Sequence, residues 1–578
     1  MSPLAALVPT HLLAAAGLAL PHVNYTAIMP ELILLGGMLL LLAVSAMTPR
    51  QLPTQVYATM TAGIGIAGLI ASLILWHDVQ KGGAFTAVAR AVDVDGFAVL
   101  VLVLCSCVVI LGSFFAAGFL EREQVHGCEY YALALISAAG AMLMGSANDL
   151  ILIFLGLEIL SIPLYVMAGL DQRRAASGEA AMKYFLLGAF SSAVFVYGIA
   201  LTYGATGSTN LASIGSFLAQ NVVVSNGVLL AGLALLVVGF GFKVAAVPFH
   251  MWTPDVYAGS PTPAVGFMAA VAKIGAFGAL LRVLFSTFPT LRGTWQPILW
   301  ALAILTLLLG AVVAVVQRDV KRMLAYSSIN HAGFILLGVQ AATARGVQAS
   351  LYYLFVYSIL VLGTFGAVAV VGGRGDEGHG LERYRGLARR QPVLATILAV
   401  LLLAQAGAPF TTGFFSKLYV VEASIAAHSY ALATVAMVSA AIATFFYLRL
   451  VFLMFGEAPG RQAAVAVPLV PAGAGAAAVG GTAGQIPPVA AVPAEAPAAA
   501  GVLTLERSAG LVATGRAEAQ RMEEAVGEGA AGLVVADADL RVSPWIWSGL
   551  ALCVVTTVGL GIWPGPLVSF AHHATLLF

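Results

Sequence analysis

Long apolar runs, separated by short polar connections, make up most of the 578-residue chain. A helix needs about 20 apolar residues to cross the hydrocarbon core of a bilayer. The pattern therefore predicts an all-α polytopic membrane protein with about 14 transmembrane helices. The predicted spans are residues 29–47, 56–76, 97–120, 130–147, 150–170, 184–205, 227–248, 264–286, 297–316, 324–342, 350–372, 393–427, 429–455 and 545–566.

Two segments depart from this pattern. Residues 1–28 are apolar but contain three prolines and two histidines. They predict either a signal segment or a short interfacial helix, and the lack of a basic region before the apolar run favours the helix. Residues 456–544 are rich in Ala, Pro, Gly and Val. This composition predicts a low-complexity cytoplasmic insert that acts as a spacer or docks a partner, with a short amphipathic helix within Glu506–Arg541.

The basic residues of the connections favour one topology. Most of them follow odd-numbered spans, and short loops rich in Lys and Arg stay in the cytoplasm. The chain is therefore expected to cross the cell inner membrane many times, with both termini in the periplasm. The connection between spans 2 and 3 fits this rule least well, because it contains Lys81 and Arg90. The basic residues after odd-numbered spans are Arg50, Arg122, Arg173, Arg174, Arg318, Lys321, Arg322, Arg374, Arg383, Arg385, Arg389 and Arg390.

Composition excludes several classes of protein. Sixty per cent of the residues are hydrophobic, 9% are charged and the mean hydropathy is +0.96, which no water-soluble domain could bury. A net charge of +1 gives no electrostatic basis for nucleic-acid binding. The four cysteines form no CxxC pair, and no phosphate-binding P-loop motif occurs. The sequence therefore predicts no metal or other cofactor site in this chain.

Charged side chains inside the predicted spans are the strongest indication of function. A charge at the bilayer centre costs roughly 3 kcal/mol, so it persists when it is paired, lines a hydrated cavity or titrates. Static ion pairs would account for such residues structurally, but Glu158 lies too deep for its carboxylate to reach the interface, which favours a functional role. Lys183 lies at the edge of a span, where a snorkelling side chain explains it equally well. The residues well inside spans are Glu158, Lys243, Lys273 and Lys417.

Two of these lysines stand at predicted breaks in their helices. Lys243 lies between two glycines and Pro248, and Lys417 follows the sequence Gly407–Gly413, which contains a proline. Broken helices inside a membrane are tolerated around a cavity or a protein-lined site. The breaks fall in spans 7 and 12, which cross in opposite directions. This arrangement predicts two inverted five-helix repeats with a broken helix at the same place in each.

The predicted organisation has five parts. A leading segment contains spans 1–3, two repeats contain spans 4–8 and 9–13, and an insert separates the last span from the rest. The corresponding ranges are residues 1–128, 129–286, 287–455, 456–544 and 545–578.

The chemistry of lysine suits a proton relay. A buried lysine can release its proton near neutral pH, whereas arginine stays charged. A nearby carboxylate that moves or is neutralised could therefore load and unload the amine. His250 and His331 are candidate intermediate stations, although a histidine in an apolar helix is often a hydrogen-bonded packing residue.

Four sequence stretches resemble a known family. They are SGEAAMKYFLLG at 177–188, GFGFKVAAVPFHMWTPDVY at 239–257, VKRMLAYSSINH at 320–331 and GFFSK at 413–417. They are similar to the antiporter-like subunits of respiratory complex I, the NADH:quinone oxidoreductase, over residues 29–456 and the last span. Lysine at 417 favours the subunit N family, equivalent to mitochondrial subunit 2, over subunit M. The lack of a long C-terminal amphipathic helix argues against subunit L, and the insert departs from the family pattern.

The resemblance implies a function and roles for individual residues. It implies a subunit of a proton-translocating enzyme driven by quinone reduction in neighbouring subunits. Carried over by position, Glu158 is the helix-5 glutamate that modulates Lys243, Lys273 is the bridging lysine and Lys417 is the lysine on the exit side. Lys183 also matches a family lysine.

The resemblance also implies partners. The complex is implied to hold NADH, flavin, iron–sulfur clusters and quinone in other subunits, and this chain is implied to bind homologous antiporter-like subunits, small membrane subunits and the lipid bilayer. The alternative is a subunit of a stand-alone cation/proton antiporter, for which the same fold and lysines would serve. A third reading is a scaffold with static ion pairs.

Overall fold

The computed structural model describes residues 23–48, 52–125, 127–221, 226–456 and 542–574. The predicted interfacial helix within 1–28 falls almost entirely outside these residues. So does the insert at 456–544, including its predicted amphipathic helix.

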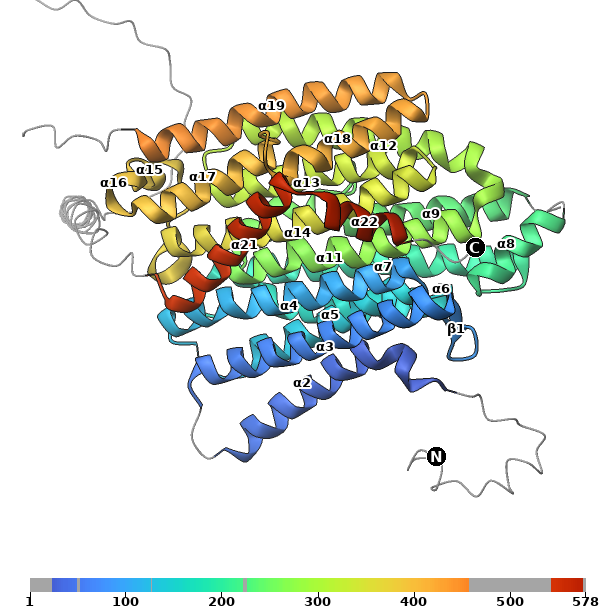
Figure 1. Cartoon of the computed structure of the whole chain (residues 1–578), viewed down its shortest axis with the longest axis horizontal. Coiled ribbons are helices and arrows are strands. Elements are labelled where there is room, and N and C mark those ends of the chain that lie inside the picture. The colour runs from blue at the N-terminus through green and yellow to red at the C-terminus, as the bar shows by residue number, and fades with distance from the viewer. Residues whose placement is uncertain (1–22, 49–51, 126, 222–225, 457–541, 575–578) are drawn as a thin grey trace, which may run out of the picture. The chain divides into compact units, whose positions relative to one another are not determined.

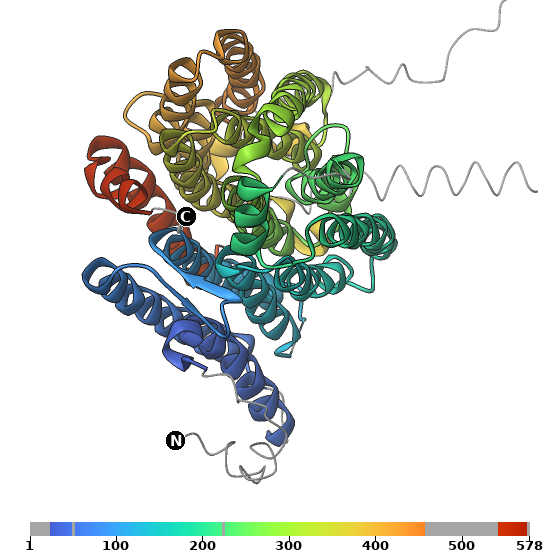
Figure 2. The same ribbon diagram turned by 90° about the vertical axis from the view of Figure 1, so that its right-hand side faces the viewer.

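Helices packed side by side form nearly the whole described structure (Figures 1 and 2). Eleven of them are long and apolar enough to cross a membrane, which confirms the all-α polytopic class. The count of 14 crossings remains a prediction. The eleven contain α2 (Met29–Met47), α3 (Thr54–Gly82), α4 (Gly96–Arg122), α6 (Leu150–Ala168), α7 (Ala175–Thr206), α9 (Asn226–Val244), α11 (Thr262–Arg282), α12 (Arg292–Val316), α14 (Ala344–Gly372), α19 (Tyr430–Phe455) and α21 (Pro544–Ile562).

The other predicted spans are also helical, but they are shorter or more polar. The span at 393–427 is divided into two helices, as its glycines and proline indicate. These helices are α5 (Glu129–Ser146), α13 (Val320–Gln340), α17 (Pro392–Ala406) and α18 (Thr412–Ala426).

Several short elements were not predicted. A two-stranded antiparallel hairpin pairs β1 with β2 directly before α4. The other short elements are helices at the ends of the long ones. These elements are β1 (Phe85–Ala87), β2 (Val92–Val94), α8 (Leu211–Gln220), α10 (Trp252–Gly259), α15 (Leu381–Tyr384), α16 (Leu387–Arg390) and α22 (Gly565–His573).

Both predicted helix breaks are present. Helix α9 ends at Val244 and α10 begins at Trp252, so seven residues of non-helical chain follow Lys243 almost directly. Helix α17 ends at Ala406, where Gly407 takes the left-handed conformation with φ of 95°, and α18 begins at Thr412. A residue with a side chain would be strained at that φ. The broken helices of the predicted fold are thereby confirmed.

Helix α11 is the most deeply placed element. Every one of its residues is buried, and it packs against α4, α5, α6, α9 and α14. A helix that is apolar all round belongs in the interior of a bundle. Lys273 lies on this helix, so its amine is far from lipid.

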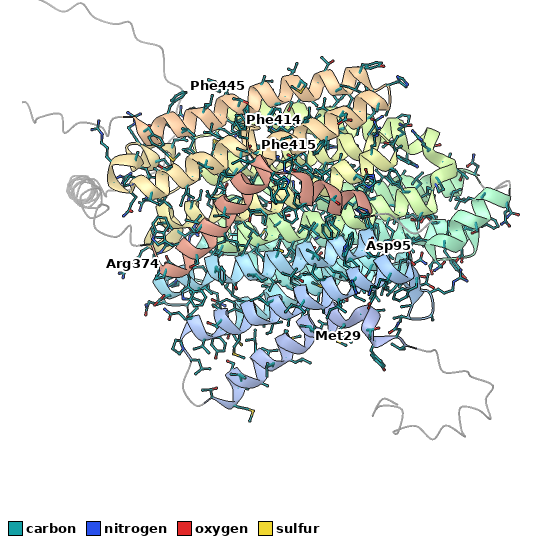
Figure 3. The ribbon with its side chains drawn as sticks, in the orientation of Figure 1. Met29, Asp95, Arg374, Phe414, Phe415 and Phe445 are labelled. Atoms are coloured by element: carbon teal, nitrogen blue, oxygen red, sulfur yellow. The ribbon has the colours of Figure 1, made fainter. Side chains whose placement is uncertain are left out.

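The connections gather at two opposite ends of the bundle. Helices α15 and α16 lie at one end, and α8 and β1 lie at the other (Figure 1). Arg374 and Asp95 mark these ends in Figure 3. Contacts at the Arg374 end join connections that follow odd-numbered spans, because Arg173 donates to the carbonyl of Glu123 at 3.1 Å and Arg174 pairs with Asp376 at 3.4 Å.

Candidate functional site

Lys243 lies in the last turn of α9, where the helix breaks. Its side chain is 2% exposed, and its ammonium lies 5.3 Å from the ring centroids of both Tyr165 and Tyr184. Within the described residues its Nζ has no hydrogen-bond partner. An aromatic face attracts a desolvated cation by about 2 kcal/mol. Two tyrosine rings, from α6 and α7, are therefore the immediate electrostatic partners of this amine.

Glu158 lies on α6, two turns before Tyr165. It interacts electrostatically with Lys243, but no ion pair within 4 Å joins the two among the described residues. Glu158 Oε1 is buried and has no hydrogen-bond partner there, and the same holds for the hydroxyl of Tyr184. Buried polar groups normally have partners. Among the described residues, Glu158 Oε1 and the Tyr184 hydroxyl are exceptions to this rule.

Trp252 fixes the ring of Tyr184 from the side of α10. The two rings are stacked with centroids 4.6 Å apart and planes 8° apart. The Trp252 indole N–H donates to the carbonyl of Phe242 at 2.9 Å. This bond connects the start of α10 to the last turn of α9, across the helix break and next to Lys243.

Lys273 occupies a second site. It is 3% exposed, donates a hydrogen bond to the carbonyl of Ser328 on α13 and lies 5.0 Å from the ring centroid of Tyr357 on α14. The hydroxyls of Ser328 and Tyr357 are 2.8 Å apart. A backbone carbonyl and an aromatic ring hold this amine, and no carboxylate in the described part of the chain forms an ion pair with it.

His331 lies one turn further along α13, between two tyrosines. Its Nδ1 is 2.7 Å from the Tyr353 hydroxyl, and its Nε2 is 3.1 Å from the Tyr447 hydroxyl. Tyr447 also bonds the hydroxyl of Ser327 and donates to Gln405 Oε1 at 3.3 Å. His331 is thus part of a hydrogen-bonded network of four helices.

Lys417 lies in the second turn of α18, directly after the other helix break. It is 8% exposed and donates to the carbonyl of Ala406, the last residue of α17, at 2.8 Å. Its ammonium lies 5.1 Å from the ring centroid of Phe334, which stacks on Tyr353. The network of His331 therefore extends to the neighbourhood of Lys417.

The predicted residues thus form two groups. Glu158 and Lys243 lie together with Tyr165 and Tyr184. The other group, Lys273, His331 and Lys417, is joined through α13 and its tyrosine neighbours.

His250 and Lys183 stand apart from these groups. His250 lies in the turn between α9 and α10 and is half-buried, and its Nδ1 has no partner within the described residues. Lys183 is 43% exposed and pairs with Glu179 at 2.6 Å and Asp255 at 3.0 Å. Asp255 also binds Arg322 at 2.9 Å, so Lys183 belongs to a bridge between α7, α10 and α13.

The tyrosines and Gln405 around these amines were missed by the sequence reasoning. Tyrosines are common in membrane spans, and nothing local separates Tyr184 or Tyr447 from one that faces lipid. The one available signal is their position beside charged residues in the quoted stretches, as for Tyr184 next to Lys183.

A buried carboxylate at the Arg374 end was also missed. Asp376 is 1% exposed and accepts hydrogen bonds from the backbone N–H of Thr262 at 3.0 Å and its hydroxyl at 2.7 Å. It also pairs with Lys321 at 3.3 Å, Arg174 at 3.4 Å and His379 at 2.9 Å. Burial alone would raise the pKa of Asp376, but the Lys321 ammonium and the hydrogen bonds from His379 and Thr262 hold it well below its ordinary value.

A second buried ion cluster lies at the opposite end. Arg282, at the end of α11, pairs with Asp95 at 2.9 Å and Asp93 at 3.1 Å. All three side chains are buried. Burial raises the pKa of Asp93 to about 6, against the opposing effect of Arg282. The cluster fixes the β1–β2 hairpin to the end of the central helix.

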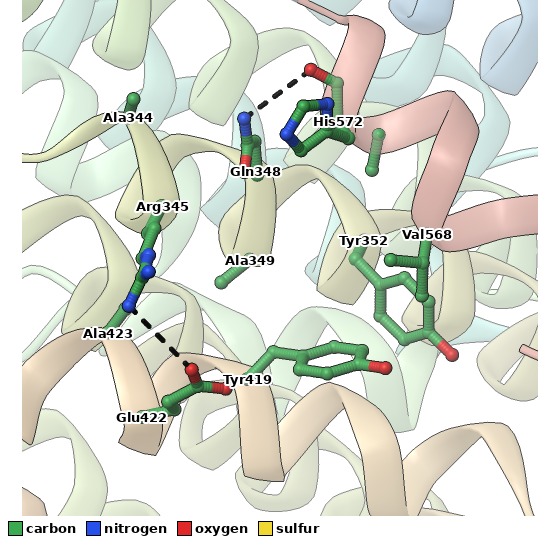
Figure 4. Close-up of a pocket in the computed structure, with 11 residues that line it drawn as sticks. Ala344, Arg345, Gln348, Ala349, Tyr352, Tyr419, Glu422, Ala423, Val568 and His572 are labelled. Carbon is green, nitrogen blue, oxygen red and sulfur yellow. Dashed lines mark hydrogen bonds and ion pairs between the residues drawn. The ribbon is translucent and has the colours of Figure 1, made fainter. Parts of the chain in front are cut away.

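A cavity of about 500 Å³ opens between α14, α18 and α22 (Figure 4). Tyr352 and Tyr419 meet edge to face with ring centroids 5.1 Å apart, and Arg345 pairs with Glu422 at 4.0 Å. The cavity lies near the start of α14, whereas Asp376 follows its end. Tyr419 lines this cavity and lies two residues after Lys417 on α18. The cavity is therefore close in sequence to Lys417, toward the C-terminal end of that helix.

Metal ligation finds no support in the part of the chain that the structure describes. No group of three His, Cys, Asp or Glu side chains there is close enough to hold an ion.

The family model for the NADH:quinone oxidoreductase/Mrp antiporter transmembrane family matches residues 147–443, just over half of the chain. The chain belongs to this family. The match begins before α6 and ends within α19, so both broken helices and all the candidate relay residues lie inside the region common to the NADH:quinone oxidoreductase/Mrp antiporter family.

Two similar relatives are both named NADH-quinone oxidoreductase subunit N. NADH-quinone oxidoreductase subunit N of Mycobacterium tuberculosis H37Rv is 41% identical over 492 residues, which cover 78% of this chain and 92% of that protein. Subunit N of a Parafrankia species is 41% identical over 481 residues, covering 78% and 90%. The predicted resemblance to subunit N is thereby confirmed.

Two solved structures have a similar fold. A chain of respiratory complex I from Thermus thermophilus with bound aureothin superimposes with a TM-score of 0.68 at 28% identity, covering 93% of this chain and 98% of that one. A chain of the Mrp complex from a Dietzia species gives a TM-score of 0.73 at 20% identity, covering 95% and 96%. The second match shows the fold alone.

Proposed function

We propose that this chain is a proton-translocating subunit in the membrane arm of an NADH:quinone oxidoreductase. The observation that carries the proposal is the burial of three lysines, each beside an aromatic ring, with Lys243 and Lys417 next to helix breaks. Such amines are expensive to keep inside a membrane, and function is the usual reason for their presence. Family membership and the 41% identity to proteins named NADH-quinone oxidoreductase subunit N support the same conclusion.

Each candidate residue receives a role in this proposal. Lys243 holds a proton that Glu158 attracts or releases, depending on its own charge and position. Lys273 receives the proton on the central helix, and His331 with its two tyrosines carries it toward Lys417. Hydrogen-bonded chains of this kind conduct protons by small rotations of hydroxyl and imidazole groups. His250 and Lys183 remain predicted participants: His250 at the break, and Lys183 as a support of α10.

Lysine suits proton transfer inside the membrane better than arginine does. An amine in apolar surroundings can exist in both charged and neutral forms, whereas a guanidinium cannot. The basic residues of the connections are mainly arginine, whereas three of the six lysines, Lys243, Lys273 and Lys417, lie buried within helices.

The proposal extends to partners and placement. The redox groups, namely flavin, iron–sulfur clusters and quinone, would lie in other subunits, and homologous and small membrane subunits would flank this chain. The Arg374 end would face the cytoplasm, because it gathers the basic connections, and both termini would face the periplasm. The chain would act as part of an enzyme without a redox centre of its own. The division at residues 128, 286, 455 and 544 remains part of this proposal.

A subunit of a cation/proton antiporter is the second candidate. It is favoured by the fold shared with the Dietzia Mrp complex. Purification in mild detergent separates the two. Co-purification with NADH dehydrogenase activity and iron–sulfur subunits supports the first, and isolation with an exchanger that lacks both supports the second.

Replacement of single lysines tests the relay. Lys243→Leu should abolish proton translocation through this subunit while the complex still assembles, and Lys81→Leu, on the exposed end of α3, should have no effect. Full translocation in the Lys243 variant would refute the relay and leave the scaffold with static ion pairs as the explanation.

A further inference from the structure

The short helix α10 touches both lysine sites. It has eight residues, and non-helical backbone precedes and follows it. Trp252 at its start contacts the Lys243 site, and Tyr257 near its end contacts the Lys273 site. Their ring centroids are 6.3 Å apart, so the two contacts are made by neighbouring side chains of one short helix.

At the Lys243 site, Trp252 determines where Tyr184 can lie. Trp252 stacks nearly parallel on Tyr184 with ring centroids 4.6 Å apart, and the Lys243 ammonium lies 5.3 Å from the centroid of the same Tyr184 ring. A shift of α10 would carry Trp252 away and release the tyrosine. Attraction of a cation by a ring falls off within about 6 Å, so even a small shift would weaken the hold on the charged amine.

At the Lys273 site, Tyr257 acts through Ser328. Its hydroxyl is 3.5 Å from Ser328 Oγ, which also bonds the Tyr357 hydroxyl at 2.8 Å. The carbonyl of Ser328 accepts the hydrogen bond from Lys273, and the ring of Tyr357 lies beside the same amine. Movement of Tyr257 would therefore disturb both groups that hold Lys273.

The outer side of α10 is held by charge. Asp255 pairs with Lys183 on α7 at 3.0 Å and with Arg322 on α13 at 2.9 Å. These side chains are about 40% exposed, so the pairs are weak and can exchange with water. The ion pairs of Asp255 therefore position α10 but do not prevent it from moving.

We propose that α10 couples the two amines, with Trp252 and Tyr257 as its positioning residues. When Lys243 carries its proton, its ammonium attracts the Tyr184 ring, and the stack of Trp252 on Tyr184 keeps α10 in the position seen in the structure. When Lys243 is neutral, this attraction is lost and α10 can shift. Tyr257 then moves relative to Ser328, which weakens the contacts of Ser328 and Tyr357 with Lys273. Both amines bias the position of one element, which is the physical requirement for coupling between sites. The inference rests on the proposed relay.

The experiment compares two buried tryptophans in membrane vesicles that contain the whole complex. The indole of Trp295 donates to the carbonyl of Phe288 at 2.9 Å, as Trp252 does to Phe242, but Trp295 lies outside the relay. Trp252→Leu should lower proton translocation through this subunit about tenfold and shift its pH profile. Trp252→Phe, which keeps a ring for stacking, should restore most of it. Trp295→Leu should leave the protons moved per NADH oxidised, and the pH profile, unchanged.

A double variant tests the connection between the ends of α10. Tyr257→Phe removes the hydroxyl and keeps the ring. If α10 acts as one element, Trp252→Leu and Tyr257→Phe together should reduce translocation hardly more than Trp252→Leu alone, whereas independent effects would multiply. Independent effects, or equal effects of the Trp252 and Trp295 variants, would overturn the coupling.

These outcomes are distinct from failure of the relay itself. If Lys243→Leu abolishes translocation but Trp252→Leu leaves both translocation and its pH profile unchanged, the relay stands and the coupling by α10 is wrong. If Lys243→Leu translocates normally, the proposed function is wrong.

Discussion

The ammonium of Lys243 lies 5.3 Å from the ring centroid of Tyr184, and no acidic side chain within the described residues is close enough to form an ion pair with it. Glu158 acts on this amine from a greater distance. A lysine held by aromatic faces keeps a compensating attraction when charged but loses little when neutral. This arrangement suits a group that changes its charge during turnover.

Lys243→Arg tests whether the amine must release its proton. Arginine keeps the positive charge and the attraction to the rings but stays protonated. We expect translocation through this subunit to fall about 100-fold, as when a proton-transfer group is removed. The measurement is the number of protons moved per NADH oxidised in sealed vesicles. Lys81→Arg, at an exposed position, is the control, and a normal ratio in the Lys243 variant would contradict the prediction.

The sequence was sufficient to find the charged residues and the helix breaks. A charge within an apolar run is conspicuous because of its cost, and Gly and Pro beside Lys243 and Lys417 indicated where each helix would end. The residues that surround these amines could not be predicted. Tyr184 is 59 residues from Lys243 and Tyr447 is 116 residues from His331, so their contacts depend on how the helices pack.

The same limit applies to the buried ion clusters. Asp376 lies in a polar connection, which by sequence alone is typical of a solvated loop. Its bond to Thr262 spans 114 residues, and the bond between Arg282 and Asp93 spans 189. The β1–β2 hairpin was missed for a related reason: three-residue strands are too short for their alternation to be distinguished from a loop.

Gly407→Ala should displace Lys417. The left-handed φ of 95° costs a residue with a side chain about 1–2 kcal/mol, and the new methyl group would lie 3.1 Å from Lys417 Cδ. We expect slower proton translocation with an assembled complex. Gly293→Ala, in α12, meets nothing within 4 Å and is the matched control, with a neutral or slightly stabilising effect. Equal translocation in the two variants would show that the turn at 407 does not position the amine.

Asp376→Asn should destabilise the subunit by about 3–5 kcal/mol, because it leaves Lys321 and Arg174 buried or half-buried beside a neutral group. The measurement is the half-life of quinone reductase activity on heating the purified complex. Because the pKa of Asp376 is held below its ordinary value, its contribution is present above about pH 4 and is lost as the pH falls below that. The difference from the native chain should thus be constant between pH 5 and pH 8. Asp78→Asn, exposed on α3, should have no effect, and a similar loss there would refute a specific role for Asp376.

Asp93 and Asp95 should respond differently to the same substitution, although both bind Arg282. A carboxyl group with a raised pKa stabilises the fold when protonated, and that contribution is lost as the pH rises through its folded value of about 6. As the pH rises from about 4 to about 7, Asp93 should therefore lower the stability of the native chain by about 3 kcal/mol. Asp93→Asn mimics the protonated form, so it should be more stable than the native chain by roughly half of this amount near pH 5 and by nearly all of it at pH 7.5.

Asp95→Asn provides the contrast in heat-inactivation measurements from pH 5 to pH 7.5. Both Asp95 oxygens accept from Arg282, at 2.9 and 3.0 Å, so this carboxylate is the main counter-charge of the buried guanidinium. Its neutralisation should destabilise the subunit by about 3 kcal/mol or more over the whole range. If Asp93→Asn were as harmful as Asp95→Asn at pH 7.5, both carboxylates would be needed in their charged form and the assignment of a raised pKa to Asp93 would be wrong.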